Sequence, residues 1–129
     1  MLSSALGPLI AYAGDLEYNP GMSFDTLVEE LKRLPAEQVR YDFTNYLEFV
    51  IDTRCVKDLC PILESHLGPP LKTAGKEPSQ EAKKCTDQLG GIEKNQVLYY
   101  LRGGVFSQCA MLWPWEDKNL VTVKVAQSR

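Results

Sequence analysis

The chain has very few of the side chains on which enzyme chemistry most often depends. Among its 129 residues there is one histidine, His66. Any nucleophile activated by a histidine would have to use this residue, yet His66 falls in the last turn of a predicted helix. There its simplest role is to interact with the free carbonyl groups of the helix end. No nucleophile, base and oxyanion site can be assembled from the sequence, which favours a function without catalysis.

Long apolar runs and export signals are also missing. No stretch approaches the ~20 apolar residues of a membrane-spanning helix. The segment Ala11-Tyr12-Ala13 has the small-x-small pattern of a cleavage site, but no Lys or Arg precedes it and Gly7-Pro8 interrupts the apolar residues. Without export, the four cysteines are expected to be reduced. The sequence therefore predicts a soluble, cytoplasmic protein without membrane contact.

Dense positive charge, the mark of nucleic-acid binding, is absent. The net charge is −3, with an acidic excess in residues 1–70 and a mild basic excess in residues 71–129. The basic residues of the second half are dispersed, so we expect no nucleic-acid partner. The uneven charge is better suited to orienting a second subunit or a protein partner. It favours a homo-oligomer, in the simplest form a homodimer, or a protein–protein complex.

The spacing of the cysteines does not match a metal site. Cys55 and Cys60 are separated by four residues, and no second pair follows, because Cys85 and Cys109 are isolated. We therefore expect no metal and no cofactor. An alternative remains for Cys55 and Cys60, a thiol-based redox or metal-handling function. Cys55 would precede a helix, where the amide dipoles favour the thiolate.

The loop at residues 68–78, GPPLKTAGKEP, weakly resembles a phosphate-binding loop. The spacing of its glycines is too long, and Glu77 follows Lys76 where a Ser or Thr is needed. A weak anion site at Lys72 is the remaining binding hypothesis for this loop, and a solvated loop is the simpler interpretation.

Hydrophobic periodicity predicts a single domain over residues 1–129, with residues 1–21 as an N-terminal arm. Helices are expected at about 23–34, with Ser23 as N-cap, then at about 58–67 and 79–89. Pro61 belongs in a first turn, which sets the expected start of the second helix near Asp58. Strands are expected at 96–101, 105–113 and 120–126, joined by turns at 102–104 and 116–119.

Residues 36–52 are ambiguous. Val39, Tyr41 and Phe43 alternate as on a strand, whereas Val39, Phe43 and Tyr46 also fit one helical face. With a strand here, the chain has an α+β fold, a two-layer sandwich. In it, an antiparallel meander of three to four strands is covered on one face by two or three helices. Lys124, on the terminal strand, would then discourage pairing at an exposed sheet edge.

Both tryptophans lie in the segment MLWPWEDKN, on either side of Pro114. Alternation along residues 105–113 places Trp113 with a core-like set, and Pro114 ends the strand. Trp115 lies beyond the strand, where no core periodicity requires it, and Glu116 follows. Exposed tryptophans often anchor interfaces. We therefore expect a binding module in which Trp113, Trp115 and Glu116 form the contact surface, with Trp113 chiefly structural.

Overall fold

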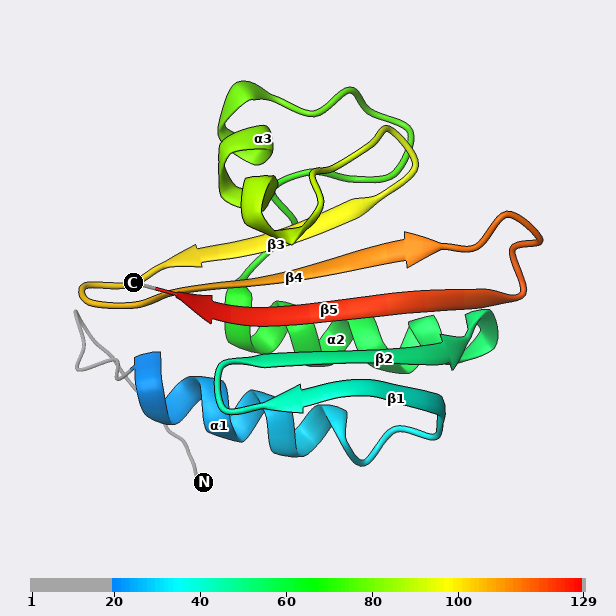
Figure 1. The fold of residues 1–129 in the computed structure, drawn as a ribbon, viewed down its shortest axis with the longest axis horizontal. Coiled ribbons are helices and arrows are strands. Elements are labelled where there is room, and N and C mark those ends of the chain that lie inside the picture. Colours follow the sequence, from blue (N-terminus) through cyan, green and yellow to red (C-terminus); the bar gives the residue numbers. More distant parts are fainter. Residues whose placement is uncertain (1–19, 129) are drawn as a thin grey trace.

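The computed structural model describes residues 20–128, so most of the predicted N-terminal arm lies outside the described residues. Three α-helices, two short 3-10 helices and five strands follow one another along the chain (Figure 1). In chain order they are α1 (Pro20–Leu31), β1 (Ala36–Phe43), β2 (Tyr46–Asp52), η1 (Thr53–Cys55), α2 (Val56–Leu67), α3 (Gln80–Thr86), η2 (Asp87–Leu89), β3 (Val97–Arg102), β4 (Ser107–Pro114) and β5 (Leu120–Ser128).

The strands form one sheet in the order β1-β2-β5-β4-β3, and all neighbours are antiparallel. The predicted meander β3-β4-β5 is confirmed. The ambiguous residues 36–52 form a hairpin that turns at Thr44 and Asn45, so the sheet has five strands and not three or four. Because β2 adds beside β5, β5 is a central strand, and the expected edge position of Lys124 was wrong.

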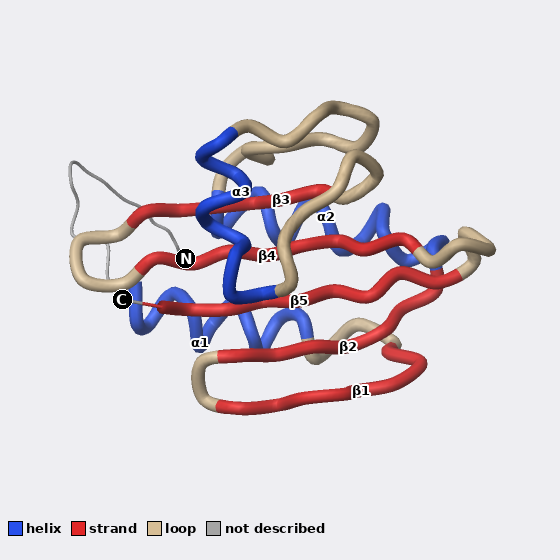
Figure 2. Tube along the Cα trace, turned by 45° about the horizontal axis from the view of Figure 1, so that its top comes forward, coloured by secondary structure: helices blue, strands red, loops and turns tan. Residues whose placement is uncertain are grey.

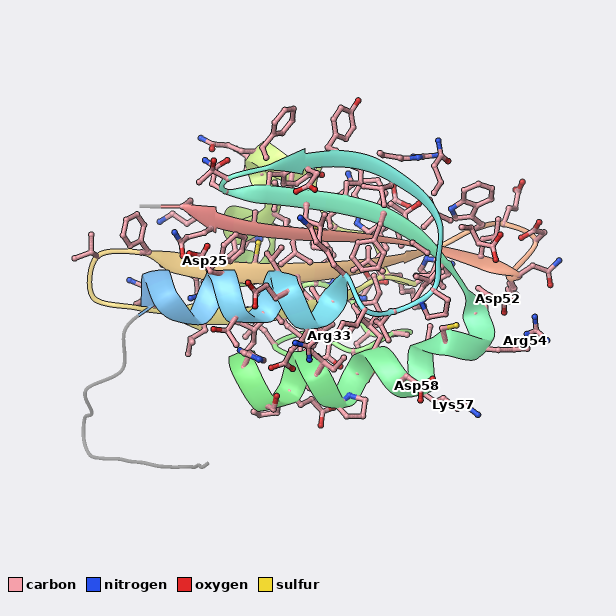
Figure 3. The ribbon with its side chains drawn as sticks, turned by 90° about the horizontal axis from the view of Figure 1, so that it is seen from below. Asp25, Arg33, Asp52, Arg54, Lys57 and Asp58 are labelled. Carbon is pink, nitrogen blue, oxygen red and sulfur yellow. The ribbon has the colours of Figure 1, made fainter. Side chains whose placement is uncertain are left out.

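Helices α1 and α2 lie side by side on one face of the sheet and cover the larger core (Figures 1 and 3). This core contains buried side chains from both helices and from alternate positions of the inner strands. They include Phe24, Leu27, Leu31, Leu59, Leu63, Leu67, Phe49, Ala110, Leu112, Val121, Val123 and Val125. The regular helical and strand spacing of these residues is the feature that the sequence displays most clearly.

The short helix α3 packs on the opposite face, over β3 and β4 (Figure 2). Its Ala82 is buried in a second cluster with Leu98, Cys109 and Met111, which alternate along their strands with residues of the larger core. The prediction that helices cover only one face of the sheet was therefore wrong. Tyr99 and Leu98 explain the difference, because adjacent residues of β3 are both buried and each face needs its own cover.

The helix ends differ from expectation where proline is involved. α1 begins at Pro20, so Ser23 is inside the helix; a proline is well accommodated in a first turn because its missing N–H has no partner there. α2 begins at Val56, two residues before the predicted start at Asp58, and Pro61 lies inside the helix. α3 begins one residue after its predicted start, and the Ser79 hydroxyl caps it by accepting a hydrogen bond from the Ala82 amide.

A β-bulge in β1 separates side chains that simple alternation places together. Val39 pairs with Phe49, but Tyr41 pairs with Glu48, and the register shifts between them. Arg40 and Tyr41 are thus both opposite Glu48. Since Phe49 is in the larger core and Glu48 is not, Val39 lies on the helix-covered face. Tyr41 and Phe43 lie on the other face, which we call the open face where α3 leaves it uncovered.

Among the described residues, no helix combines the length and apolar character required to cross a membrane.

Candidate binding site

A groove of about 580 Å³ opens at the end of the sheet where β4 stops and β3 and β5 begin. Its walls are mostly apolar, and they come from α2, the three strands and the loop before β3. The apolar lining residues are Val56, Ala74, Val97, Leu112, Pro114, Trp115 and Val121. Four polar residues complete it: Thr53, Asn95, Glu116 and Lys118. The groove has the size and apolar lining of typical ligand sites, which measure roughly 300–1,000 Å³.

The junction between β2 and α2 fixes one wall of this groove. Asp52 accepts hydrogen bonds from the amide and the guanidinium of Arg54, and these bonds hold the pKa of Asp52 below its ordinary value. The Thr53 amide donates to the Asn119 carbonyl, and its hydroxyl donates to the Lys118 carbonyl at 2.8 Å. The β4–β5 turn is therefore attached to the start of α2. In Figure 3, Lys57 and Asp58 project from α2 away from the sheet.

Trp115 forms another part of the wall and is half-buried, whereas the sequence predicted an exposed ring. Its backbone amide donates to the Leu120 carbonyl, and its indole Nε1 donates to Thr122 Oγ1 at 2.9 Å. The Arg40 guanidinium lies 5.9 Å from the ring centroid. Thr122 alternates with Val121 and Val123 of the larger core, so the indole ring is fixed on the side of the sheet opposite Leu112 and Val121, and Trp115 contributes to the groove from the end of β4.

The other residues expected to bind are distributed over the molecule. Glu116 is exposed on the rim of the groove. Lys72 is buried, and its ammonium donates to the carbonyls of Lys94 and Gln96 at 2.5 and 2.6 Å. Burial lowers the pKa of Lys72. Because both contacts are internal, Lys72 connects two loops and does not lie in the groove.

Trp113 lies on the other face of the sheet from the groove floor formed by Leu112. Its ring packs against the second cluster, with the Lys124 ammonium 3.4 Å from the ring centroid. That ammonium also donates to the Leu89 carbonyl, and burial lowers its pKa. The structure therefore brings Trp115 and Glu116 together in one groove, and it places Trp113 in a structural contact elsewhere.

Sequence reasoning missed a polar network around Glu48 on the open face. The Glu48 side chain is 9% exposed, and its carboxylate accepts a 2.6 Å hydrogen bond from the Tyr46 hydroxyl and lies 3.5 Å from Arg40 Nη1. Burial, together with the bond to Glu48, raises the pKa of Tyr46. Glu48 is the one charged residue inside the apolar stretch YLEFVI, and that position was the available signal.

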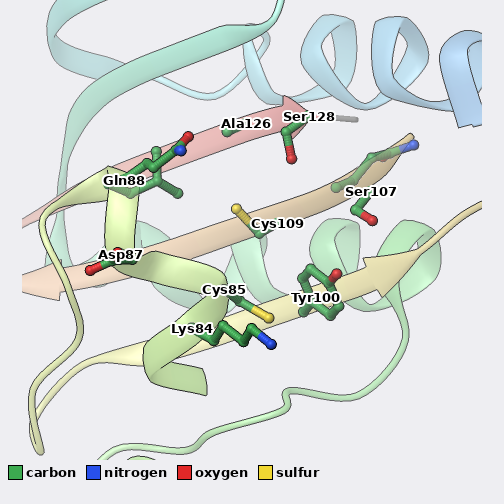
Figure 4. Close-up of a pocket in the computed structure, with 11 residues that line it drawn as sticks. Lys84, Cys85, Asp87, Gln88, Tyr100, Ser107, Cys109, Ala126 and Ser128 are labelled. Carbon is green, nitrogen blue, oxygen red and sulfur yellow. The ribbon is translucent and has the colours of Figure 1, made fainter. Parts of the chain in front are cut away.

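The four cysteines lie in two different parts of the molecule, and none is in a disulfide. Cys55 ends η1 immediately before α2, and Cys60 lies within α2; both are half-buried beside the larger core. Cys85 and Cys109 line a second cavity of about 300 Å³ under α3 (Figure 4). Burial raises the pKa of both of these thiols, that of Cys109 to about 12. Within residues 20–128, no group of three or more His, Cys, Asp and Glu side chains is arranged to hold a metal ion.

His66 is in the last turn of α2, as predicted, but its contact is with another helix. Its Nε2 lies 3.2 Å from Glu30 Oε2 of α1. The partner of His66 is thus a carboxylate, and the Glu64 carbonyl near the end of α2 accepts a hydrogen bond from the amide of Gly68. His66 therefore joins the two helices that cover the larger core, and it lies outside the groove.

The fold and the groove define an α+β protein with a five-stranded antiparallel sheet, helices on both faces and an apolar cavity at one sheet end. None of the family models, curated proteins or solved structures with which the chain was compared matches it. What the chain can bind is therefore inferred from the residues of the groove itself.

Proposed function

We propose that this chain is a small binding or accessory protein that takes an apolar group of a ligand or partner into the groove beside Trp115. The observation that carries the proposal is the groove's apolar lining, fixed on three strands and α2. A rigid apolar cavity with few polar groups at its rim is the usual form of a ligand site. We place this activity in the cytoplasm, because the spacing of the four cysteines gives no sign of a disulfide framework.

A charge placed in the groove tests this function. Val56→Asp introduces a carboxylate into the lining at the first position of α2, where an acidic residue is tolerated by the helix dipole. We expect it to weaken binding of the uncharged, apolar fluorescent probe N-phenylnaphthylamine at least tenfold. The control is Lys57→Asp, which adds an acid in the same helical turn but outside the groove lining. Equal binding by both variants, or absence of binding by the unaltered chain, would contradict the proposal.

We also propose that a second copy of the chain covers the free edge of the sheet. Leu71 and Lys72 cover the β3 edge, where their amides donate to the Leu98 carbonyl. No segment within residues 20–128 covers the β1 edge in this way, and all eight residues of β1 are exposed. Three of the five exposed large hydrophobic side chains of the described residues lie on β1. They are Val39, Tyr41 and Phe43, at 57%, 50% and 62% exposure.

The charges of β1 suit pairing with a copy of itself. Arg40 lies between Glu37 and Asp42, so an antiparallel copy can place each Arg40 opposite an acidic residue. Sedimentation of the full chain should show a dimer that Phe43→Lys dissociates. Val105→Lys is the matched control, because Val105 is equally exposed, at 66%, but lies between β3 and β4. A monomer at high concentration, or equal effects of both changes, would exclude this interface.

The alternative function, redox or metal handling by Cys55 and Cys60, stays a prediction. Native mass spectrometry of protein purified without reductant or chelator separates the two. A retained organic ligand supports the groove, whereas a disulfide or a bound metal at Cys55 and Cys60 supports the alternative.

A further inference from the structure

Lys118 has a backbone conformation that lysine rarely adopts. Its φ is +62°, the only positive φ at a non-glycine residue among those the structure describes. Such a conformation is unfavourable for a residue with a Cβ, and glycine adopts it freely. The turn holds Lys118 there, because its amide donates to the Trp115 carbonyl and its own carbonyl accepts from Thr53. The position suits glycine on backbone grounds, so the lysine requires an explanation from its side chain.

Lys118 lines the rim of the apolar groove and is exposed. Its ammonium makes no ion pair with any residue from 20 to 128. Other lysines near the sheet are engaged: Lys72 bonds two carbonyls, and Lys124 bonds the Leu89 carbonyl. Lys118 thus provides one unpaired positive charge at the mouth of a cavity whose walls are apolar.

We propose that the groove binds a small amphipathic monocarboxylate. This inference rests on the proposed function and specifies its ligand. The apolar body lies against Val56, Leu112 and Val121, and the carboxylate lies at the mouth, where it pairs with the Lys118 ammonium. A carboxylate remains partly hydrated there, so neither charge has to be buried. Glu116 on the same turn opposes the negative charge and restricts the ligand to one carboxylate.

Calorimetric titration of the full chain with octanoate, octanol and octylamine tests this inference. The three probes share an apolar chain and differ in charge. We expect octanoate to bind about fivefold more tightly than octanol, the range of an exposed ion pair, and octylamine to bind most weakly. Raising the salt concentration should reduce this preference, because an ion pair at the rim is screened.

Lys118→Gly removes the charge without disturbing the turn, because glycine favours a positive φ. Its melting temperature should equal or exceed that of the unaltered chain. It should lose the fivefold preference for octanoate and keep its affinity for octanol. Glu116→Gln should strengthen octanoate binding about twofold and leave octanol unchanged.

The outcomes separate this inference from the function on which it rests. Equal affinities for octanoate and octanol, or an equal loss of both in Lys118→Gly, would overturn the carboxylate assignment and leave the apolar groove intact. Failure of all three probes to bind at millimolar concentration would overturn both.

Discussion

The indole Nε1 of Trp115 lies 2.9 Å from Thr122 Oγ1, so a residue that lines the groove is fixed to a central strand of the sheet. Thr122 is buried on β5, opposite Val50 of β2. Arg40 adds a contact from β1, and its guanidinium also reaches Glu48. A residue outside any strand is therefore held by side chains from two strands, so a change at either contact should affect both the stability of the fold and the shape of the groove.

This bond predicts that Thr122→Val destabilises the fold and disturbs the groove. Valine has the shape of threonine but leaves the Trp115 N–H without its partner, which costs about 1–2 kcal/mol for a partly buried donor. Urea denaturation should show this loss, and probe binding should weaken. Thr122→Ser keeps the acceptor and should retain most of the affinity. Unchanged unfolding free energy in Thr122→Val would mean that the bond contributes nothing.

The contact between Gly90 and Trp113 predicts a specific sensitivity to a single methyl group. Gly90 has φ +101°, and a Cβ added there would lie 3.0 Å from Cη2 of Trp113. Gly90→Ala therefore combines backbone strain with a clash, and we expect a loss of more than 2 kcal/mol. Gly75→Ala is the matched control, since Gly75 has φ +86° and open space around it. Denaturant titrations giving equal losses for both would show that Trp113 moves away freely.

The bond from Tyr46 to Glu48 predicts a dependence of stability on alkaline pH. The pKa of Tyr46 is raised in the folded chain, so its contribution is complete below the unfolded pKa of about 10 and is lost above it. Because the ring is half-buried, the loss per pH unit should be well below the limit of about 1.4 kcal/mol. Unfolding free energies of Tyr46→Phe should decline less steeply above pH 10. Tyr99→Phe serves as the comparison variant. Burial raises the pKa of Tyr99 as well, so the alkaline slope of this variant shows what a buried tyrosine contributes without a bond to Glu48. Identical slopes in Tyr46→Phe and the unaltered chain would refute the assignment.

The thiols should react with alkylating agents in an order set by burial. Cys109 is buried and its pKa is raised to about 12, so it should be modified last in the native protein. Cys85 should react slowly, because burial raises its pKa, although a hydrogen bond with Tyr100 partly offsets this effect. Mass spectrometry of tryptic peptides after timed iodoacetamide treatment gives the order. Modification of Cys109 ahead of Cys85 would show that α3 leaves the sheet readily.

The regular parts of the fold could be predicted from residues 20–128 because local patterns determine them. Phe24, Leu27 and Leu31 recur at helical spacing, and β3, β4 and β5 are marked by β-branched and aromatic residues with turns between them. Pro114 ends β4 where expected, and Ser79 caps α3. These features need only neighbouring residues, so the α+β class follows from the sequence.

Tertiary structure alone decided the rest, because it depends on which segments meet. The bulge at Arg40 and Tyr41 is set by pairing with Glu48, and no local pattern reveals which face Val39 or Tyr41 will adopt. Lys124 lies on a central strand and not on the expected edge, because β2 pairs with β5. This pairing brings the apolar residues of both strands into the larger core. The groove arises where the start of α2 meets the β4–β5 turn, more than sixty residues away in the sequence. Long-range contacts of this kind leave no periodic signal, so Trp115 could be recognised as unusual from the sequence, but its partners could not.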